Sequence, residues 1–421
     1  MGRYDFLSKL EVVPEEEVSL NLKKSAKEIV NLIVKAINIK KFSAKVDLVG
    51  SFAKNTLIRG ESYEVDIFVR FDDSENISAR LEEVVKIVSK EMKINYEKIH
   101  GSRDYFRFLK DNLIFEVIPV KNIKKQSEAE NITDLTFAHV KYVQKKMNSK
   151  IRREIIIAKS FLKAQKIYGA ESYVQGFSGY SVECLIIYYK TFLNMLKSLS
   201  KLDKQLILDP EKKYKNKRDI LISLNESKVK SPVVLVDPTW KERNVLAALS
   251  DETFNKFKKI ASSFLKKPDK SYFIVKEFDR SELENFAKNH DAEVVKLVLS
   301  TEKQPGDIAG TKLKKFANYL NDKFLEKYEI IRKEFLYFGN QEAEVYYVVK
   351  QKESFLILGP PIDMKKSVDK FKKEHKNIIT KDGRLGYYCE KEKSVKEYIK
   401  KVLNKYQKVI DAISAKVIKI D

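Results

Sequence analysis

The chain has 421 residues, which is enough for about two to four domains of ordinary size. Its hydrophobic content of 43% excludes a wholly disordered protein. Lys and Arg total 82 against 60 Asp and Glu. The resulting net charge of +22 indicates a polyanionic partner, with nucleic acid as the first candidate and a merely lysine-rich soluble protein as the alternative.

The cysteines and the apolar segments favour a reducing, non-membrane environment. Cys184 and Cys389 lie far apart without a CxxC motif or a nearby histidine pair, which argues against a zinc site and a disulfide scaffold. The charged stretch 1–18 is not typical of a signal peptide, and no uninterrupted apolar run is long enough to span a bilayer. We therefore expect a cytoplasmic protein without a membrane partner.

The first 140 residues predict a small sheet accompanied by helices, which is an α+β unit. Apolar side chains at helical spacing predict a helix over 15–37, and a second helical pattern covers 79–92. Three apolar segments rich in β-branched and aromatic residues predict strands. These strands are 44–52, which enters a Gly-Ser turn, 63–71 and 113–120.

From about residue 140 to 200 the pattern is helical. The segment 151–169 carries one apolar stripe, and Gly169 stands where a helix C-terminus favours glycine. Lysines at positions 159, 163 and 166 form a basic flank beside that stripe.

After residue 275 the predicted elements follow the order β-α-β-β-α-β, a ferredoxin-like or RRM-like arrangement. The aromatic signature of RNA-binding RRM domains is missing, so the topology alone is weak support for RNA binding. The predicted elements are strand 292–300, helix 308–328, strands 342–351 and 354–361, helix 363–377 and strand 383–392.

Two acids, Glu64 and Asp66, interrupt the apolar strand 63–71. Because strand side chains alternate, both acids lie on one face while Val65 and Ile67 point into a core. Two carboxylates 4 Å apart repel by roughly 4 kcal/mol at an effective dielectric near 20. A divalent cation removes that cost, and oxygen ligands that leave room for substrate phosphates suit Mg²⁺. The alternative is an exposed strand whose acids face water.

The segment 113–120 contains a single charge, Glu116, between Phe115 and Val117. If this strand lies beside the first, Glu116 joins the other two carboxylates, and three carboxylates can hold two metals for phosphoryl transfer. Gly50 and Ser51 follow a strand, and such a turn can present backbone N–H groups to a phosphate. A Gly-Ser turn, acid-x-acid and a distant third acid form the pattern of the nucleotidyltransferase superfamily.

The resemblance extends beyond these acids to class I, archaeal-type CCA-adding tRNA nucleotidyltransferases. It covers roughly residues 1–265 with specific motifs and continues more loosely through the C-terminal part. The motifs occur in the order of that family: "GSFAKNTLIRGESYEVDIFV", "LTFAHVKYV", "AKSFLKAQKIYGAESYVQGFSGYSVECLI" and "VDPTWKERNVLAALS".

The resemblance implies a catalytic head domain (1–140), a helical nucleotide-binding central domain (141–265) and a tRNA-binding body and tail (266–421). It implies addition of C, C and A to tRNA 3′ ends from CTP and ATP without a nucleic-acid template, with Mg²⁺ as the cofactor. The implied RNA contacts are the acceptor and T-arm stem, and the implied assembly is a monomer or a homodimer.

Site residues carry over position by position. Metal and catalysis are implied for Glu64, Asp66 and Glu116. Contacts to the nucleotide are implied for Gly50, Ser51, Lys54, Arg103, Thr136, His139, Lys159, Tyr168 and Arg243, the last as the arginine that helps to read the base.

Three positions depart from the family pattern. Glu116 replaces the usual Asp and moves the carboxylate by one methylene, and Lys54 replaces an Arg and loses bidentate phosphate geometry. The histidine that relatives carry upstream of the third acid is matched by Arg103 in spacing and by His100 in residue type.

Simpler roles stay open for several of these residues. Lys159 could be solvated, Tyr168 could pack at a helix end, His139 could be structural, and Arg243 could pair with Asp237 or Glu242. At the level of the whole protein, the alternatives are a poly(A) polymerase-like or oligoadenylate-forming enzyme, a small-molecule nucleotidyltransferase, and an inactive tRNA-binding protein.

Overall fold

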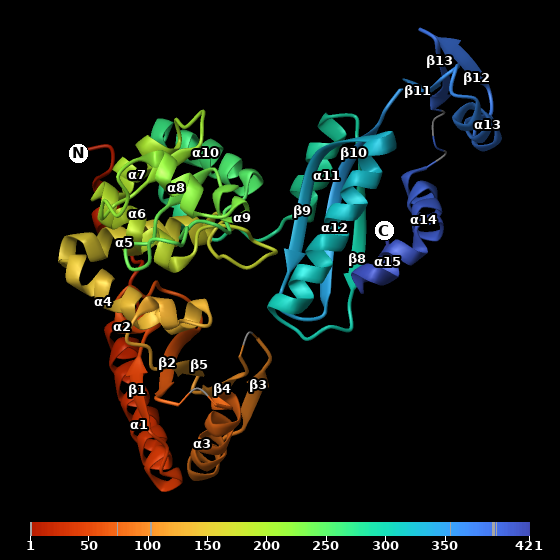
Figure 1. Cartoon of the computed structure of the whole chain (residues 1–421). Coiled ribbons are helices and arrows are strands. Elements are labelled where there is room, and N and C mark those ends of the chain that lie inside the picture. Colours follow the sequence, from red (N-terminus) through yellow and green to blue (C-terminus); the bar gives the residue numbers. More distant parts are fainter. Residues whose placement is uncertain (1, 74, 102, 354, 390–391, 393) are drawn as a thin grey trace. The chain divides into compact units, whose positions relative to one another are not determined.

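The computed structural model describes residues 2–73, 75–101, 103–353, 355–389, 392 and 394–421. The chain divides into two compact units: unit 1 comprises Met1–Ala170 with Val174–Lys276, and unit 2 comprises Glu171–Tyr173 with Glu277–Asp421. Each unit combines helices with strands (Figure 1), which confirms the predicted α+β class. The predicted division into three domains, with boundaries after residues 140 and 265, stays a prediction.

The N-terminal part of unit 1 is a five-stranded sheet in the order β1-β2-β5-β4-β3. Strands β2 and β5 are parallel, and the other neighbours are antiparallel. The elements are α1 (Glu16–Lys40), β1 (Ala44–Leu48), α2 (Gly50–Ala53), β2 (Tyr63–Phe71), α3 (Ile77–Met92), β3 (Tyr96–Ile99), β4 (Tyr105–Lys110) and β5 (Leu113–Lys121).

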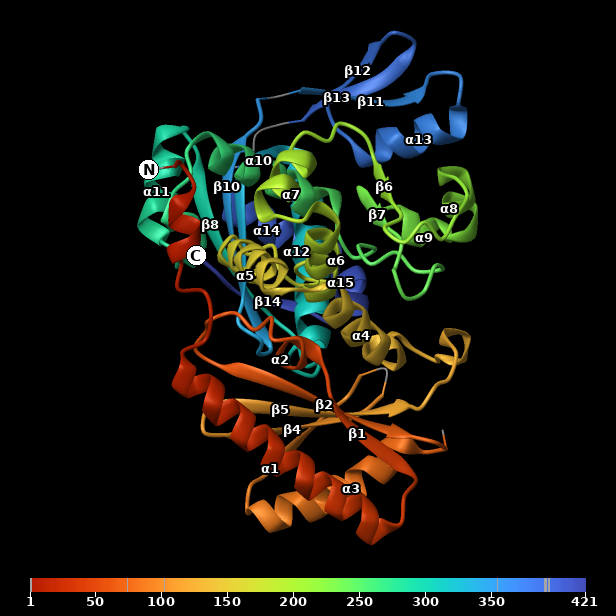
Figure 2. The same ribbon diagram turned by 90° about the vertical axis from the view of Figure 1, so that its left-hand side faces the viewer.

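The two faces of this sheet differ in what packs against them. Helices α1 and α3 lie side by side on one face, against the buried odd-numbered side chains of β2 such as Val65 and Ile67 (Figure 2). The other face carries the even-numbered side chains, and Phe68 packs there with Val120 of β5 and Val140 of α4 (Thr136–Lys146). Glu64 and Asp66 therefore share the face opposite α1, as strand alternation predicts.

The sequence predicts β2, β5 and the helices correctly but not the whole sheet. Strand β1 ends at Leu48, and the predicted Gly-Ser turn is the short helix α2. Strands β3 and β4 were not predicted, because their short segments carry several charged side chains. Strand β5 lies beside β2, not beside β1, which places Glu116 opposite Asp66.

The rest of unit 1 is mainly helical, as predicted, and has a separate core centred on Phe161, Phe192, Phe257 and Phe264. Its elements are α5 (Ser149–Ala164), α6 (Gly179–Tyr189), α7 (Phe192–Leu199), β6 (Leu206–Leu208), α8 (Lys217–Ser223), α9 (Glu226–Val229), β7 (Val233–Leu235) and α10 (Asp251–Lys266). Single 3-10 turns occupy Asp5–Lys9, Gln126–Glu128, Ile132–Leu135 and Lys270–Phe273.

Gly169 does not end the helix α5, so that prediction was wrong. The helix stops at Ala164, and Lys166 takes the left-handed conformation with φ 56°. Gly169 lies beyond the helix with φ 130°, where its N–H donates to the carbonyl of Phe177. The glycine therefore allows two backbone segments to approach each other closely, and it does not end a helix.

Unit 2 contains a four-stranded antiparallel sheet in the order β14-β8-β10-β9 and a separate three-stranded sheet in the order β11-β13-β12. Its elements are α11 (Arg280–Asn289), β8 (Glu293–Ser300), α12 (Asp307–Lys327), β9 (Tyr328–Tyr337), β10 (Glu342–Gln351), β11 (Phe355–Pro361), α13 (Lys365–Glu374), β12 (Ile378–Lys381), β13 (Arg384–Cys389), α14 (Val395–Lys405), α15 (Gln407–Ile413) and β14 (Lys416–Ile420).

The larger sheet has the ferredoxin-like strand order, but not with the strands that the sequence predicted. The order β8-α12-β9-β10, followed by α14, α15 and β14, completes the β-α-β-β-α-β pattern. Two predicted members, β11 and β13, belong to the smaller sheet, which is an insertion between β10 and α14. The prediction missed β9 and β14, because β9 follows α12 without a break and β14 is short.

Candidate active site

Three acids meet on β2 and β5, and we call Glu64, Asp66 and Glu116 the acid cluster. The parallel register pairs Asp66 directly with Glu116. The pKa of Asp66 is raised to about 7, first by burial and then by the neighbouring charges of Glu116 and Glu64. The pKa of Glu64 is also raised, first by burial and then by Glu116. The acid cluster thus concentrates negative charge that a cation would relieve.

Gly50 brings the α2 turn into close contact with the acid cluster. Its φ is +67°, and a Cβ at this position would lie 1.7 Å from Oδ2 of Asp66. The backbone N–H of Val49 donates to the carbonyl of Asp66 at 2.9 Å. Only glycine fits this position, for both its backbone conformation and its contact with the carboxylate. Ser51 follows it on α2 and is half-buried.

Arg107 of β4 lies opposite Glu116 in the sheet and donates to it from two nitrogens. The distances to Oε1 of Glu116 are 2.7 Å from Nη2 and 3.2 Å from Nε. Within the described residues, no three Asp, Glu, His or Cys side chains stand close enough together to hold a metal ion. In this structure the Glu116 carboxylate is paired with Arg107.

A second cluster joins the sheet to the helices of unit 1, and we call Lys54, Lys159 and Glu183 the lysine cluster. Nζ of Lys54 lies 2.6 Å from Oε2 of Glu183, and Nζ of Lys159 lies 2.7 Å from Oε1. Thr56 also donates to Oε1 at 2.9 Å. All three charged side chains are buried. Burial alone would raise the pKa of Glu183, but Lys159 and Lys54 hold it well below its usual range.

The lysine cluster holds two ammonium groups for one carboxylate, so it carries an excess positive charge. The charge of Lys54 partly opposes the rise in the pKa of Asp66 that burial and the neighbouring carboxylates cause. Lys159 is only 1% exposed, so the alternative of a solvated lysine is wrong for this residue. A Cβ at Gly179 would lie 2.8 Å from the Tyr168 hydroxyl and 3.9 Å from Nζ of Lys159, so this tyrosine borders the lysine cluster.

A third group surrounds the fully buried Asp237, and we call His139, Tyr180, Asp237 and Arg243 the arginine cluster. Oδ2 of Asp237 lies 2.7 Å from Nη1 of Arg243 and 3.2 Å from Nε2 of His139. Tyr180 donates to Oδ1 at 3.1 Å, and its ring stacks on His139 with centroids 4.0 Å apart. Burial lowers the pKa of His139, and Arg243 adds to that shift while Asp237 opposes it.

Among the remaining predicted residues, Thr136 is half-buried at the start of α4, three residues before His139. Arg103 donates to the buried Asp134 and, at 2.7 Å, to Glu130. His100 is exposed and lies 2.9 Å from Oδ1 of Asp104. Arg103 therefore contacts the segment 130–134. Within the described residues, its hydrogen bonds go to Asp134 and Glu130 and not to members of the three clusters.

Sequence reasoning missed the residues that complete these clusters. Glu183 carried a readable signal, because it is the one charge in the apolar run of α6, as Glu116 is in the segment 113–120. Arg107 had no such signal, because it follows from the unpredicted pairing of β4 with β5. From the sequence alone, Asp237 is expected only as an ion-pair partner of Arg243, in the alternative in which Arg243 has a purely structural role.

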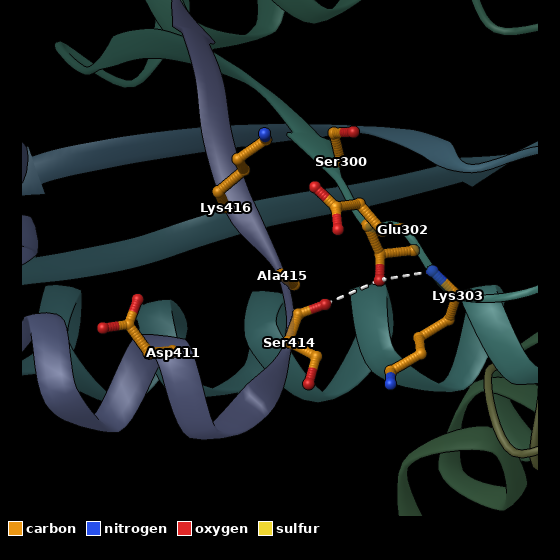
Figure 3. A pocket seen from close by; sticks show the side chains of 8 residues that line it. Ser300, Glu302, Lys303, Asp411, Ser414, Ala415 and Lys416 are labelled. Carbon is orange, nitrogen blue, oxygen red and sulfur yellow. Dashed lines mark hydrogen bonds between the residues drawn. The ribbon is translucent and has the colours of Figure 1, made fainter.

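A pocket of about 450 Å³ in unit 2 has a different chemical character. Figure 3 shows that its lining combines two acids with two lysines around the junction of α15 and β14. The hydroxyl of Thr301 donates to the carbonyl of Ser414 at 2.6 Å. Lining residues are Ser300, Thr301, Glu302, Lys303, Asp411, Ser414, Ala415 and Lys416.

Comparisons with known proteins agree on one class of enzyme. The family model "tRNA nucleotidyltransferase, second domain" matches residues 153–274. A CCA-adding enzyme of Nanoarchaeum equitans is 32% identical over 403 residues, which cover 93% of this chain and 94% of that protein. A CCA-adding enzyme of Methanocaldococcus jannaschii is 28% identical over 91% of this chain and 86% of its own length.

Among solved structures, a poly(U) polymerase bound to MgATP superposes with a TM-score of 0.50 at 11% identity, covering 65% of this chain and 97% of that one. This similarity shows a shared fold only. Helices long and apolar enough to cross a membrane are missing from the part of the chain that the structure describes.

Proposed function

The chain belongs to the family of CCA-adding enzymes, and we propose that it adds C, C and A to the 3′ end of tRNA from CTP and ATP without a nucleic-acid template. The observation that carries this proposal is the register of β2 and β5, which pairs Asp66 with Glu116 beside the Gly50 turn. Nucleotide addition to tRNA is the activity of the family, and the acid cluster is where this chain would perform it.

The donor set of the acid cluster fits a hard divalent cation. All the oxygens it offers are carboxylate oxygens, and burial, followed by the charges of Glu116 and Glu64, raises the pKa of Asp66. We propose Mg²⁺ as that cation, held by Glu64, Asp66 and Glu116. When bound, Mg²⁺ would neutralise the charge that develops on the transferred phosphoryl group.

The chain's own residues would then orient and activate the two substrates. Glu116 would accept the proton of the RNA 3′-hydroxyl, after the exchange of its bond with Arg107. The 3′ oxygen forms a bond to the α-phosphorus of the nucleotide, the bond from that phosphorus to the β-phosphate oxygen breaks, and pyrophosphate leaves. Arg107 would balance the charge of Glu116 between turnovers and keep its carboxylate beside Asp66.

The lysine cluster supplies the opposite charge for the triphosphate. Lys54 and Lys159 outnumber Glu183, and the excess charge lies in a buried setting where electrostatic attraction to phosphate is strong. Ser51 on the α2 turn and Tyr168 beside Lys159 would complete the phosphate and sugar contacts.

Base selection would fall to Arg243. Its bonds to Asp237 and His139 both use Nη1, so Nη2 and Nε keep three N–H groups for a base within the described structure. Cytosine and adenine each present a ring-nitrogen acceptor beside an amino group, whereas uracil and guanine present an N–H at that position. His139 and Tyr180 would position Arg243 through Asp237. Thr136 would contact the nucleotide from the start of α4, and Arg103 would support the segment 130–134.

We further propose that unit 2 holds the acceptor and T-arm stem through shape and phosphate contacts, because A-form stems expose little readable base edge. The oligomeric state, a monomer or a homodimer, and the cytoplasmic location stay predictions.

The test incubates the full chain with tRNA that lacks its 3′ CCA, with CTP and ATP separately and together, and with UTP and GTP as controls. We expect two C residues from CTP alone and the complete CCA only with both nucleotides. A long A tail from ATP alone would support the poly(A) polymerase-like alternative, and no addition under any condition would support an inactive tRNA-binding protein.

A further inference from the structure

A pocket of about 350 Å³ lies at the carboxyl ends of β2 and β5, apart from the three clusters described above. We call it the basic pocket. Five of its lining residues are cations, and its one acid, Asp134, is already bonded to Arg103. The lining residues are Arg70, Lys121, Ile123, Lys124, Lys125, Gln126, Asp134, Phe137, Ala138 and Lys141.

The cations of the basic pocket fall into two groups. Arg70 is fixed by Asp47 at 2.6 Å, and Lys121 lies 3.2 Å from Glu130. In contrast, Lys124, Lys125 and Lys141 have no ion pair with any acid in the described part of the chain. The pocket therefore combines two cations held in ion pairs with three exposed lysines that form no ion pair within the described residues.

Phe137 forms the apolar wall between these cations. The guanidinium carbon of Arg70 lies 4.1 Å from the centroid of its ring, and Nζ of Lys141 lies 4.4 Å from the same centroid. These cation–π contacts hold both positive groups close together despite their repulsion. An anion with several charged oxygens would relieve that repulsion, whereas a neutral ligand would not.

The position of the pocket identifies the anion. Arg70 follows Asp66 by four residues on β2, so both side chains belong to the same face of the sheet. At about 3.3 Å per residue, the two positions are about 13 Å apart. The RNA 3′ end must reach the acid cluster during the reaction, so the phosphates that precede it come within this range.

We propose that the basic pocket binds phosphodiester groups of the RNA substrate near its 3′ end. This proposal rests on the proposed function for the identity of the RNA. The pocket contacts the backbone and not the bases, since its cations are mostly lysines without a planar array for base edges. It holds the strand while the acid cluster acts on its terminal hydroxyl. A nucleotide triphosphate is the other source of phosphate, and the experiment separates the two.

The test replaces Lys124, Lys125 and Lys141 together by Gln in the full chain. The matched control replaces Lys23, Lys24 and Lys27 by Gln, three exposed lysines of α1 on the opposite face of the sheet. Binding of tRNA that lacks its 3′ CCA is measured without nucleotides at several salt concentrations. The apparent KM for CTP and the Tm are measured on the same proteins.

We expect the pocket variant to bind tRNA about tenfold more weakly at low salt. The slope of log affinity against log salt concentration should become shallower by about two units, because each of the three phosphate contacts contributes about 0.7 to that slope on a single strand. The control variant should match wild type, and the KM for CTP should be unchanged in both. If the Tm of the triple variant falls, single substitutions replace it in the test. Lys124→Glu should then weaken tRNA binding more than Lys124→Gln does.

Wild-type affinity in the pocket variant, or an equal loss in the control variant, would overturn the proposal. A raised KM for CTP with unchanged tRNA binding would assign the pocket to the triphosphate instead. Because binding is measured without turnover, a protein that binds tRNA through this pocket but adds no nucleotide would contradict the proposed function and leave this inference intact.

Discussion

The acid cluster and the lysine cluster are built on opposite imbalances of charge. On β2 and β5, three carboxylates face one arginine, and burial together with the neighbouring carboxylates raises the pKa of Asp66 to about 7. Around Glu183, two ammonium groups share one carboxylate, whose pKa is lowered. One cluster attracts a cation and the other attracts an anion. Their difference matches the two charged partners of nucleotidyl transfer, a divalent metal and a triphosphate.

Removing a carboxylate from the acid cluster should have the largest effect. Asp66→Asn should lower nucleotide addition by about 10⁴-fold, because several kcal/mol of transition-state stabilisation depend on the cation held there. Affinity for tRNA should stay within about twofold, since the lysine cluster and the basic surface are unchanged. Single-turnover addition and tRNA binding check this, with the exposed Asp73→Asn as the control. Near-normal turnover in Asp66→Asn would remove this residue from catalysis.

Neutralising the carboxylate of the lysine cluster should act on stability. Glu183→Gln leaves two buried ammonium groups without a counter-charge, so the free energy of unfolding should fall by about 3–5 kcal/mol. Urea unfolding measures this change. The control Glu91→Gln removes an exposed ion pair with Lys35 at 2.7 Å and should cost less than about 1 kcal/mol. Equal effects of both substitutions would show that the Glu183 contacts contribute no more than surface pairs.

The same pair has a defined pH dependence. The pKa of Glu183 is lower in the folded chain than in the unfolded chain, so its stabilising contribution is present above the unfolded value near 4.5. It is lost as the pH falls below that value and through the folded pKa. The stability difference between wild type and Glu183→Gln should therefore be full at pH 6 and shrink below about pH 4.5. A difference that grows on acidification would have the wrong sign.

Glu116 should affect the chemical step rather than binding. Glu116→Gln keeps the shape of the side chain but cannot accept the proton of the 3′-hydroxyl, so the single-turnover rate should fall by about 10²-fold. Affinity for CTP should change by less than about twofold, because the lysine cluster is untouched. Glu97→Gln, an exposed acid 3.9 Å from Arg107, is the matched control. Weaker CTP binding with an unchanged chemical rate would contradict the assigned role.

Arg243 tests a site outside both charged clusters and should show the smallest effect. In Arg243→Ala, CTP and ATP addition should fall, and the preference for CTP over UTP should narrow by about ten- to a hundredfold, because one or two buried hydrogen bonds are lost. Separate extensions with CTP, ATP and UTP measure this, and circular dichroism checks folding. Unchanged discrimination would leave Arg243 as only a partner of Asp237.

Local sequence patterns predicted those parts of the site that depend on one segment. The alternation in β2 placed Glu64 and Asp66 on one face, and Gly50 marked the turn that approaches them. Residues that depend on pairing between distant segments were not predictable in this way. Arg107 faces Glu116 only because β4 inserts beside β5, and Glu183 meets Lys54 across 129 residues of sequence.

The same distinction explains the error in unit 2. The periodicity of 292–300, 308–328 and 342–351 identified β8, α12 and β10, but local patterns cannot show which strands share a sheet. The chain leaves the larger sheet after β10 to form β11–β13 and returns with β14. The predicted order β-α-β-β-α-β is therefore correct for the larger sheet. The prediction was wrong in taking β11 and β13 as its last two strands, which are β10 and β14.

The most direct test of the acid cluster as the cation site is an equilibrium titration with Mn²⁺ in which electron paramagnetic resonance measures the free ion. The titration compares wild type, Asp66→Asn and Asp73→Asn. If the acid cluster is the cation site, wild type and Asp73→Asn bind Mn²⁺ with the same affinity, and Asp66→Asn loses that binding. Equal binding by all three proteins would contradict the account, because the carboxylates of β2 and β5 would then not hold the metal.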